Sequence, residues 1–110
     1  MSMKLLTLET LQNLPSFLIP RLVDLFAKTT PALLDELQQH GIATPAPAAM
    51  AQAAHKLKGS CVSLGAEQMA SICAELQHKG EQQDMQNVAS LITELAQIFP
   101  PTLAELRKFA

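Results

Sequence analysis

The chain has 110 residues, 48% of them hydrophobic but only 4% aromatic, so its core must be built from Leu, Ala, Ile, Val and Met, which favours helices. That length suits one hydrophobic core, and we expect residues 1–110 to form a single domain. The formal net charge of -2 argues against a nucleic-acid partner, and no apolar run approaches the ~20 residues of a membrane-spanning helix.

The first half of the chain carries two predicted helices. Apolar spacing predicts a short helix over residues 7–14, ended by Pro15, and a second helix over residues 17–39. Pro31 removes a backbone donor inside the second segment, so we expect a kink or a break there. Gly41 is predicted to end this helix in the left-handed cap position. The predicted inward stripe consists of Leu18, Leu22, Leu25, Phe26, Thr29, Leu33 and Leu37.

Two further helices are predicted after a proline-containing connection, over residues 48–64 and 66–79. Gly65 separates them, and Gly80 is predicted to stop the second. Apolar residues recur at steps of four and three, which is typical of helices that face a bundle core. The predicted inward residues are Met50, Ala54, Leu57, Cys61 and Leu64 in the first helix and Met69, Ile72, Cys73 and Leu76 in the second.

A last helix is predicted after a polar turn over residues 81–84, with Asp84 as its N-cap. Pro100 and Pro101 should kink or end it, and Thr102 is predicted to cap a final short piece. The predicted inward residues are Val88, Leu91, Leu95 and Ile98, then Leu103, Leu106 and Phe109. Because short connections make successive helices antiparallel, the predicted fold is all-α: an up-down antiparallel four-helix bundle with a short extra N-terminal helix.

His55, Lys58 and Gly59 share one face of the helix predicted over residues 48–64. At roughly 100° per residue His55 lies beside the inward stripe, and the other two follow one turn later. A neutral imidazole is a nucleophile near neutral pH, and Lys58 can reach a phosphoryl group on it. Glycine costs about 1 kcal/mol relative to alanine inside a helix, so we interpret Gly59 as clearance for an approaching surface.

The chain has no P-loop and no protein-kinase motif. Nothing in it indicates a site for ATP, so any phosphoryl group must come from another protein and leave to another. The start of the chain also lacks the long apolar region and cleavage site of a signal peptide, and we expect a cytoplasmic protein.

The segment His55-Lys56-Leu57-Lys58-Gly59-Ser60, followed by Leu64-Gly65-Ala66, resembles the motif of the histidine-containing phosphotransfer (HPt) domain of multistep phosphorelays. Residues 8–37 and 72–80 also resemble helices of that family. The resemblance implies a phosphorelay intermediate of two-component signal transduction. It would take a phosphoryl group from the phospho-aspartate of one response-regulator receiver domain and pass it to the aspartate of another.

The resemblance also implies the roles of single residues. His55 would accept the phosphoryl group through Nε2, Lys58 would stabilise its oxygens, and Gly59 would keep the docking face open. Gln77, which follows His55 by 22 residues, would hydrogen-bond in the site. Apolar side chains of the first two helices would form the rim of the docking face, with Leu11, Phe17 and Ile19 as candidates.

The receiver would supply the divalent metal, so no cofactor is expected in this chain. Nothing demands a dimer or direct membrane contact, and we expect a monomer. The family includes both free-standing proteins and the last domain of hybrid sensor histidine kinases. The start Met1-Ser2-Met3 and the end soon after the final helix fit an excised C-terminal domain, with a sensor kinase in the same polypeptide.

Two alternatives to phosphotransfer are open. The first is a non-catalytic helical adaptor that binds receiver or kinase domains without phosphotransfer, and the intact His55 weighs against it. The second is a zinc site, but the spacings match no zinc pattern, and the two cysteines are expected to be buried thiols rather than a disulfide. The zinc candidates are His40, His55, Cys61, Cys73 and His78.

Overall fold

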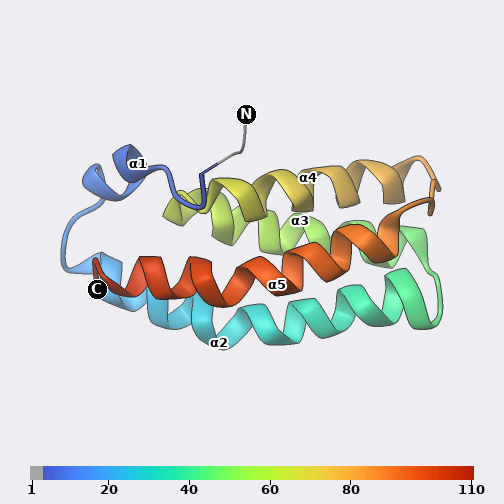
Figure 1. Cartoon of the computed structure of the whole chain (residues 1–110), viewed down its shortest axis with the longest axis horizontal. Coiled ribbons are helices and arrows are strands. Elements are labelled where there is room, and N and C mark those ends of the chain that lie inside the picture. Colours follow the sequence, from blue (N-terminus) through green and yellow to red (C-terminus); the bar gives the residue numbers. More distant parts are fainter. Residues whose placement is uncertain (1–3) are drawn as a thin grey trace.

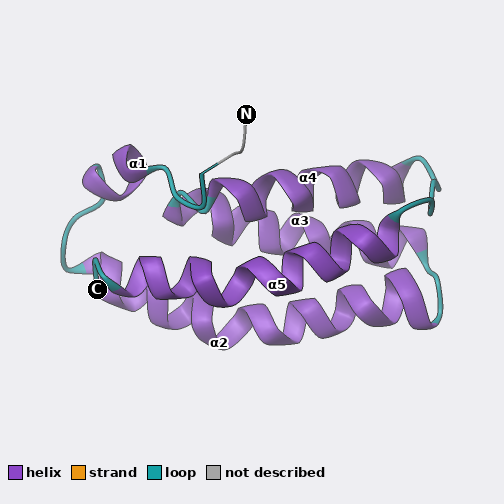
Figure 2. Ribbon diagram, viewed as in Figure 1, coloured by secondary structure: helices purple, strands orange, loops and turns teal. Residues whose placement is uncertain are grey.

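The computed structural model describes residues 4–110, which form helices joined by short connections (Figures 1 and 2). The helices are α1 (Leu8–Gln12), α2 (Leu18–Gln38), α3 (Pro47–Leu64), α4 (Glu67–Glu81) and α5 (Val88–Arg107), and a π-helical turn η1 (Gln39–Ala43) extends α2. Residues 1–3, which entered the expectation of an excised domain, lie outside the described residues.

Helices α2 to α5 form an up-down bundle in which each is antiparallel to the next (Figure 1). Helix α3 packs between α2 and α4, and α5 closes the ring by packing against both α4 and α2. Helix α1 lies at the end of the bundle where α3 turns into α4 (Figure 1). The predicted fold is therefore confirmed. In the described part of the chain, no helix is both long and apolar enough to cross a membrane.

Gly65 joins α3 to α4 and also ties the N-terminal segment to the bundle. Its φ of 71° lies in the left-handed region, which glycine adopts without strain. The Thr7 N–H donates to the Gly65 carbonyl at 2.7 Å, and a Cβ on Gly65 would lie 2.7 Å from the Thr7 oxygen. The predicted break at Gly65 is confirmed, and the site has no room for a side chain.

The core is filled by the predicted stripes of α3 and α4, all of whose residues are buried. In α2 the predicted inward face is rotated by part of a turn from the face that is buried. Leu25 is 57% exposed, because α3 and α5 cover the face that centres on Phe26 rather than the neighbouring one. The buried residues of α2 are Ile19, Val23, Phe26, Thr30, Leu34 and Leu37.

None of the three prolines ends its helix, so the break at Pro31 and the end at Pro100 and Pro101, each predicted as an alternative to a kink, do not occur. Pro31 lies inside α2, and Pro100 and Pro101 lie inside α5. All three are exposed, so the carbonyls one turn earlier, which lose a donor, lie on the water-facing side of the helix. Thr102 does not cap a separate piece. It is buried within α5, and its hydroxyl donates to the Ile98 carbonyl at 2.6 Å.

Gly41 and Gly80 do not end helices, which corrects two further predictions. Gly41 has no left-handed backbone and is buried against α5, where a Cβ would collide with the side chain of Ile92. Gly80 lies within α4, and a Cβ there would come within 2.5 Å of the Pro47 carbonyl oxygen and 2.8 Å of the Ala51 Cβ. Gly80 allows two backbones to approach closely, whereas Gly41 leaves room for the side chains of Ile92, Val88 and Met50.

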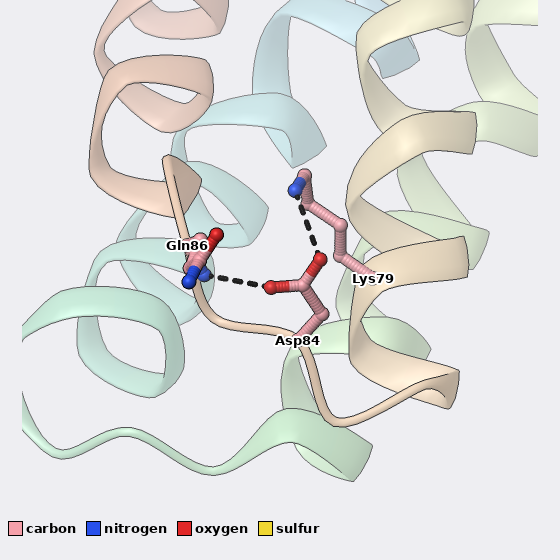
Figure 3. Close-up of polar contacts among 3 residues, drawn as sticks. All are labelled: Lys79, Asp84 and Gln86. Atoms are coloured by element: carbon pink, nitrogen blue, oxygen red, sulfur yellow. Dashed lines mark hydrogen bonds and ion pairs between the residues drawn. The ribbon is translucent and has the colours of Figure 1, made fainter.

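The connection between α4 and α5 differs from the predicted N-cap. Helix α5 begins at Val88, and the residue before it, Asn87, has a positive φ of 63°. Asp84 instead accepts from the Gln86 N–H at 3.0 Å and pairs with Lys79 at 3.4 Å (Figure 3). The hydrogen bond from Gln86, and then the Lys79 ammonium, hold the pKa of Asp84 below its ordinary value. Asp84 therefore organises the turn rather than the helix start.

Candidate functional site

His55, Lys58 and Gly59 lie on the outer face of α3, between α2 and α4. His55 and Gly59 are exposed and Lys58 is half-buried. A Cβ built on Gly59 would meet no described atom within 4 Å, so packing does not explain a glycine there. The structure therefore presents an imidazole, a cation and an open stretch of backbone on one helix face.

His55 contacts Gln77, the residue that the family resemblance implies as its hydrogen-bond partner. The His55 Nδ1 lies 3.3 Å from the Gln77 Oε1. An amide oxygen only accepts, so in this arrangement Nδ1 carries the proton and donates. The lone pair of the imidazole is then on Nε2, for which the structure gives no hydrogen-bond partner among residues 4–110. That tautomer leaves Nε2 unprotonated, as a nucleophile requires.

Close packing of α3 on α4 brings the two residues together. Gly80 packs against Ala51, one turn before His55, while Gln77 lies one turn before Gly80 on the antiparallel helix. The contact between Gly80 and Ala51 thereby sets the register in which Gln77 reaches His55. A side chain larger than hydrogen at position 80 would separate the helices at this point.

Glu81 is a further residue of this cluster that the sequence analysis placed in a turn. It is the last residue of α4, and its Oε2 accepts from the Gln77 Nε2 at 3.4 Å. The two residues are four apart on one helix, a spacing at which side chains meet. The spacing of four residues could have indicated the contact between Gln77 and Glu81. It was missed because the helix was predicted to stop at Gly80.

Two grooves flank this face of α3. The larger, of about 970 Å³, lies between α3 and α4 and contains His55, Gln77 and Glu81. The smaller, of about 400 Å³, lies between α2 and α3 and contains Leu25 and Gly59. Lys56 lines both, so it stands on the ridge between them.

The apolar rim differs from the expected one. Leu11 and Ile19 are buried, at 2% and 8% exposed, and take part in the core, whereas Phe17 is 67% exposed. Leu25 of α2, which lines the smaller groove together with Gly59, is 57% exposed and was missed because it was assigned to the core. Val62, three residues after Gly59 on α3, is 60% exposed.

Cys61 and Cys73 are buried free thiols, as predicted. A hydrogen bond between them, together with burial, raises the pKa of the Cys73 thiol above its ordinary value. Cys73 is thus an inert core thiol at neutral pH. Within residues 4–110, no group of three or more His, Cys, Asp or Glu side chains could hold a metal ion.

Comparison with known proteins gives one match. The model of the family described as "Hpt domain" matches residues 21–99, a segment that contains all of α3 and α4 and therefore His55 and Gln77. No curated protein and no solved structure matches the chain.

Proposed function

Because this chain belongs to the Hpt domain family and is thus a phosphotransfer intermediate in a two-component phosphorelay, we propose that His55 is the residue that carries the phosphoryl group. The observation that supports this most directly is the 3.3 Å contact between the His55 Nδ1 and the Gln77 Oε1. A hydrogen bond from Nδ1 to this oxygen favours the tautomer in which Nε2 carries no proton and is free to attack.

The transfer step follows from this arrangement. The Nε2 lone pair attacks the phosphorus of the aspartyl phosphate of a receiver domain. A nitrogen–phosphorus bond forms, the bond from phosphorus to the aspartate oxygen breaks, and its electron pair leaves with the aspartate carboxylate. The ring gains positive charge, and the proton stays on Nδ1, where the Gln77 oxygen accepts its hydrogen bond. The reverse step delivers the group to the next receiver.

Two neighbours support the step. The Lys58 ammonium, one turn along from His55, offers positive charge for the phosphoryl oxygens, which carry the charge in such transfers. Gly59 leaves its surroundings open within 4 Å, so a receiver surface can approach the ring. Leu25 and Val62 supply exposed apolar area beside this opening, and we assign the receiver's footprint to them.

Hpt domains interact with receiver domains, and the further details of the partnership are our proposals. All the groups named above come from one copy of the chain, so we propose that it acts as a monomer. The free thiols Cys61 and Cys73 are typical of a reducing compartment, which supports a cytoplasmic location. A sensor kinase in the same polypeptide is the proposed source of the first receiver.

The proposal is tested by incubating the chain with a receiver phosphorylated on aspartate, with Mg²⁺ present, and measuring acid-labile phosphate on the chain. We expect label on the wild type and none on His55→Ala, with both proteins equally helical by circular dichroism. Equal label on His55→Ala would assign the phosphoryl group to another residue. Binding of the receiver without any label on the wild type would instead favour the non-catalytic adaptor.

A further inference from the structure

We propose that Glu81 is a positioning residue for phosphotransfer, acting through Gln77 to set which nitrogen of His55 carries the proton. This inference rests on the proposed role of His55. The three side chains form a chain of two contacts, from the Glu81 Oε2 to the Gln77 Nε2 at 3.4 Å and from the Gln77 Oε1 to the His55 Nδ1 at 3.3 Å. All three line the groove between α3 and α4.

The direction of this chain follows from what each group can do. An ionised carboxylate only accepts hydrogen bonds, whereas a glutamine amide both donates and accepts. With Glu81 on one side, the Gln77 NH₂ group is held toward the carboxylate and its oxygen is left for the imidazole. The imidazole must then donate from Nδ1, and Nε2 is the nitrogen without a proton.

Without Glu81, no hydrogen bond from the Gln77 NH₂ group to a carboxylate keeps the amide in this orientation. Turned by half a rotation, Gln77 would offer its NH₂ group to Nδ1, which would then have to accept. That arrangement suits the opposite tautomer, in which Nε2 carries the proton and cannot attack phosphorus. Glu81 therefore selects the reactive form of a ring that it does not touch.

The backbone favours this role. Gln77 and Glu81 lie one turn apart on α4, so their side chains meet without help from a loop. Gly80, between them, is packed against Pro47 and Ala51 and fixes the distance of α4 from α3. Lys56 lines the same groove, but within the described chain no ion pair joins it to Glu81, so the carboxylate remains available to the amide.

The test uses Glu81→Gln, which keeps the length of the side chain but removes its acceptor-only character. The tautomer of His55 is read from the ¹⁵N chemical shifts of its ring in the unphosphorylated chain. We expect the ratio of the Nδ1–H to the Nε2–H form to fall about threefold, the effect of one weak hydrogen bond. The rate of transfer from a phosphorylated receiver should fall in proportion to the fraction of His55 in the Nδ1–H form. An unchanged tautomer ratio would overturn the proposal.

The matched control is Glu75→Gln, which removes the same charge from an exposed position on α4 that does not line the groove. It should leave the tautomer ratio and the transfer rate as in the wild type; an equal change would mean that charge alone is responsible. In a Gln77→Ala background, Glu81→Gln should have no further effect. A further fall in that background would show that Glu81 does not act through Gln77.

The tautomer measurement involves no phosphoryl group, so it separates the two proposals. An altered ratio in Glu81→Gln with no label on the wild-type chain would refute the role of His55 as carrier and leave the hydrogen-bonded chain intact. Label on the wild-type chain together with an unchanged tautomer ratio in Glu81→Gln would support His55 as the carrier and refute the role of Glu81.

Discussion

Gly59 shows most directly what single residues contribute to the site. It lies inside α3, where glycine weakens a helix by about 1 kcal/mol relative to alanine. A Cβ there would meet no described atom within 4 Å, so the fold does not require its absence. In the proposed function, the glycine is required by the receiver surface that approaches from outside.

Replacing Gly59 should therefore separate stability from function. We expect Gly59→Leu to raise the free energy of unfolding by about 0.5–1 kcal/mol, because it improves helix propensity without a collision. Transfer from a receiver should slow about tenfold or more, because the new side chain occupies the docking face. Thermal unfolding and single-turnover transfer measure the two effects, with Gly59→Ala as the smaller step. An unchanged transfer rate in Gly59→Leu would contradict the clearance argument.

Thr30 and Thr102 form a natural pair of buried polar residues. The Thr102 hydroxyl donates to the Ile98 carbonyl at 2.6 Å, whereas the Thr30 hydroxyl has no hydrogen-bond partner among residues 4–110. Valine has the same shape without the hydroxyl. We expect Thr30→Val to raise the free energy of unfolding by about 1 kcal/mol and Thr102→Val to lower it by a similar amount. Urea titration measures both, and a loss of stability in Thr30→Val would mean that its hydroxyl is satisfied in solution.

At the scale of elements, the pairing of α3 with α4 does the most for function. Two contacts one turn apart, Gly80 on Ala51 and Gln77 on His55, follow from a single antiparallel register. The first contact depends on the missing Cβ of Gly80. The second depends on the first, because it requires α4 to lie close to α3.

A methyl group at position 80 should disturb both contacts. We expect Gly80→Ala to lower the free energy of unfolding by about 2 kcal/mol, because its Cβ would lie 2.5 Å from the Pro47 carbonyl oxygen. The helices must then separate, and the ¹⁵N shifts of the His55 ring should change as Gln77 withdraws. Gly59→Ala, which should stabilise α3, is the matched control. Wild-type stability in Gly80→Ala would contradict the close approach of the two helices.

The helices were predictable to different degrees. In α3 and α4 all the predicted inward residues are buried, so the core faces of these helices follow from spacing, whereas the end of α4 at Glu81 does not. In α2, leucines occur around much of the helix, and only the positions of α3 and α5 decide that Leu25 stays exposed. The three exposed prolines lie inside α2 and α5, because packing on both sides of them holds those helices together.

The site residues were also predictable to different degrees. His55, Lys58 and Gly59 share one helix, so periodicity alone predicts that they share a face. The contact with Gln77 depends on a register between two helices, which periodicity does not contain and which the family resemblance supplied. Glu81 was missed because Gly80 was interpreted as the end of α4, although it is a packing residue.

At the scale of the whole molecule, the outer face of α3, which we propose as the receiver's docking site, has a groove on each side. The chain contributes the imidazole, the lysine and apolar area, and it contains no motif for binding a nucleotide. In the proposed function, such a molecule depends on its receiver for most of the catalysis. Its own proposed contribution is the His55 nucleophile and a surface on which the receiver docks.

The docking footprint predicts an effect on binding without one on stability. We expect Leu25→Ala to weaken the binding of a receiver about fivefold, because the apolar area beside Gly59 is lost. The free energy of unfolding should hardly change, because the side chain is 57% exposed. Isothermal calorimetry gives the dissociation constant, and Ile42→Ala, an exposed apolar residue in the π-helical turn at the far end of α2, is the control. Equal weakening in both variants would argue against a footprint at Leu25.

The turn at Gly65 has a consequence for how the site comes into being. His55 and Gln77 lie on consecutive helices joined at this turn and are separated by 22 residues. Contacts of such short sequence separation close early in folding, because little chain entropy is lost before they form. We expect this hairpin of α3 and α4 to assemble ahead of its pairing with α2 and α5, so that the imidazole acquires its partner before the bundle is complete.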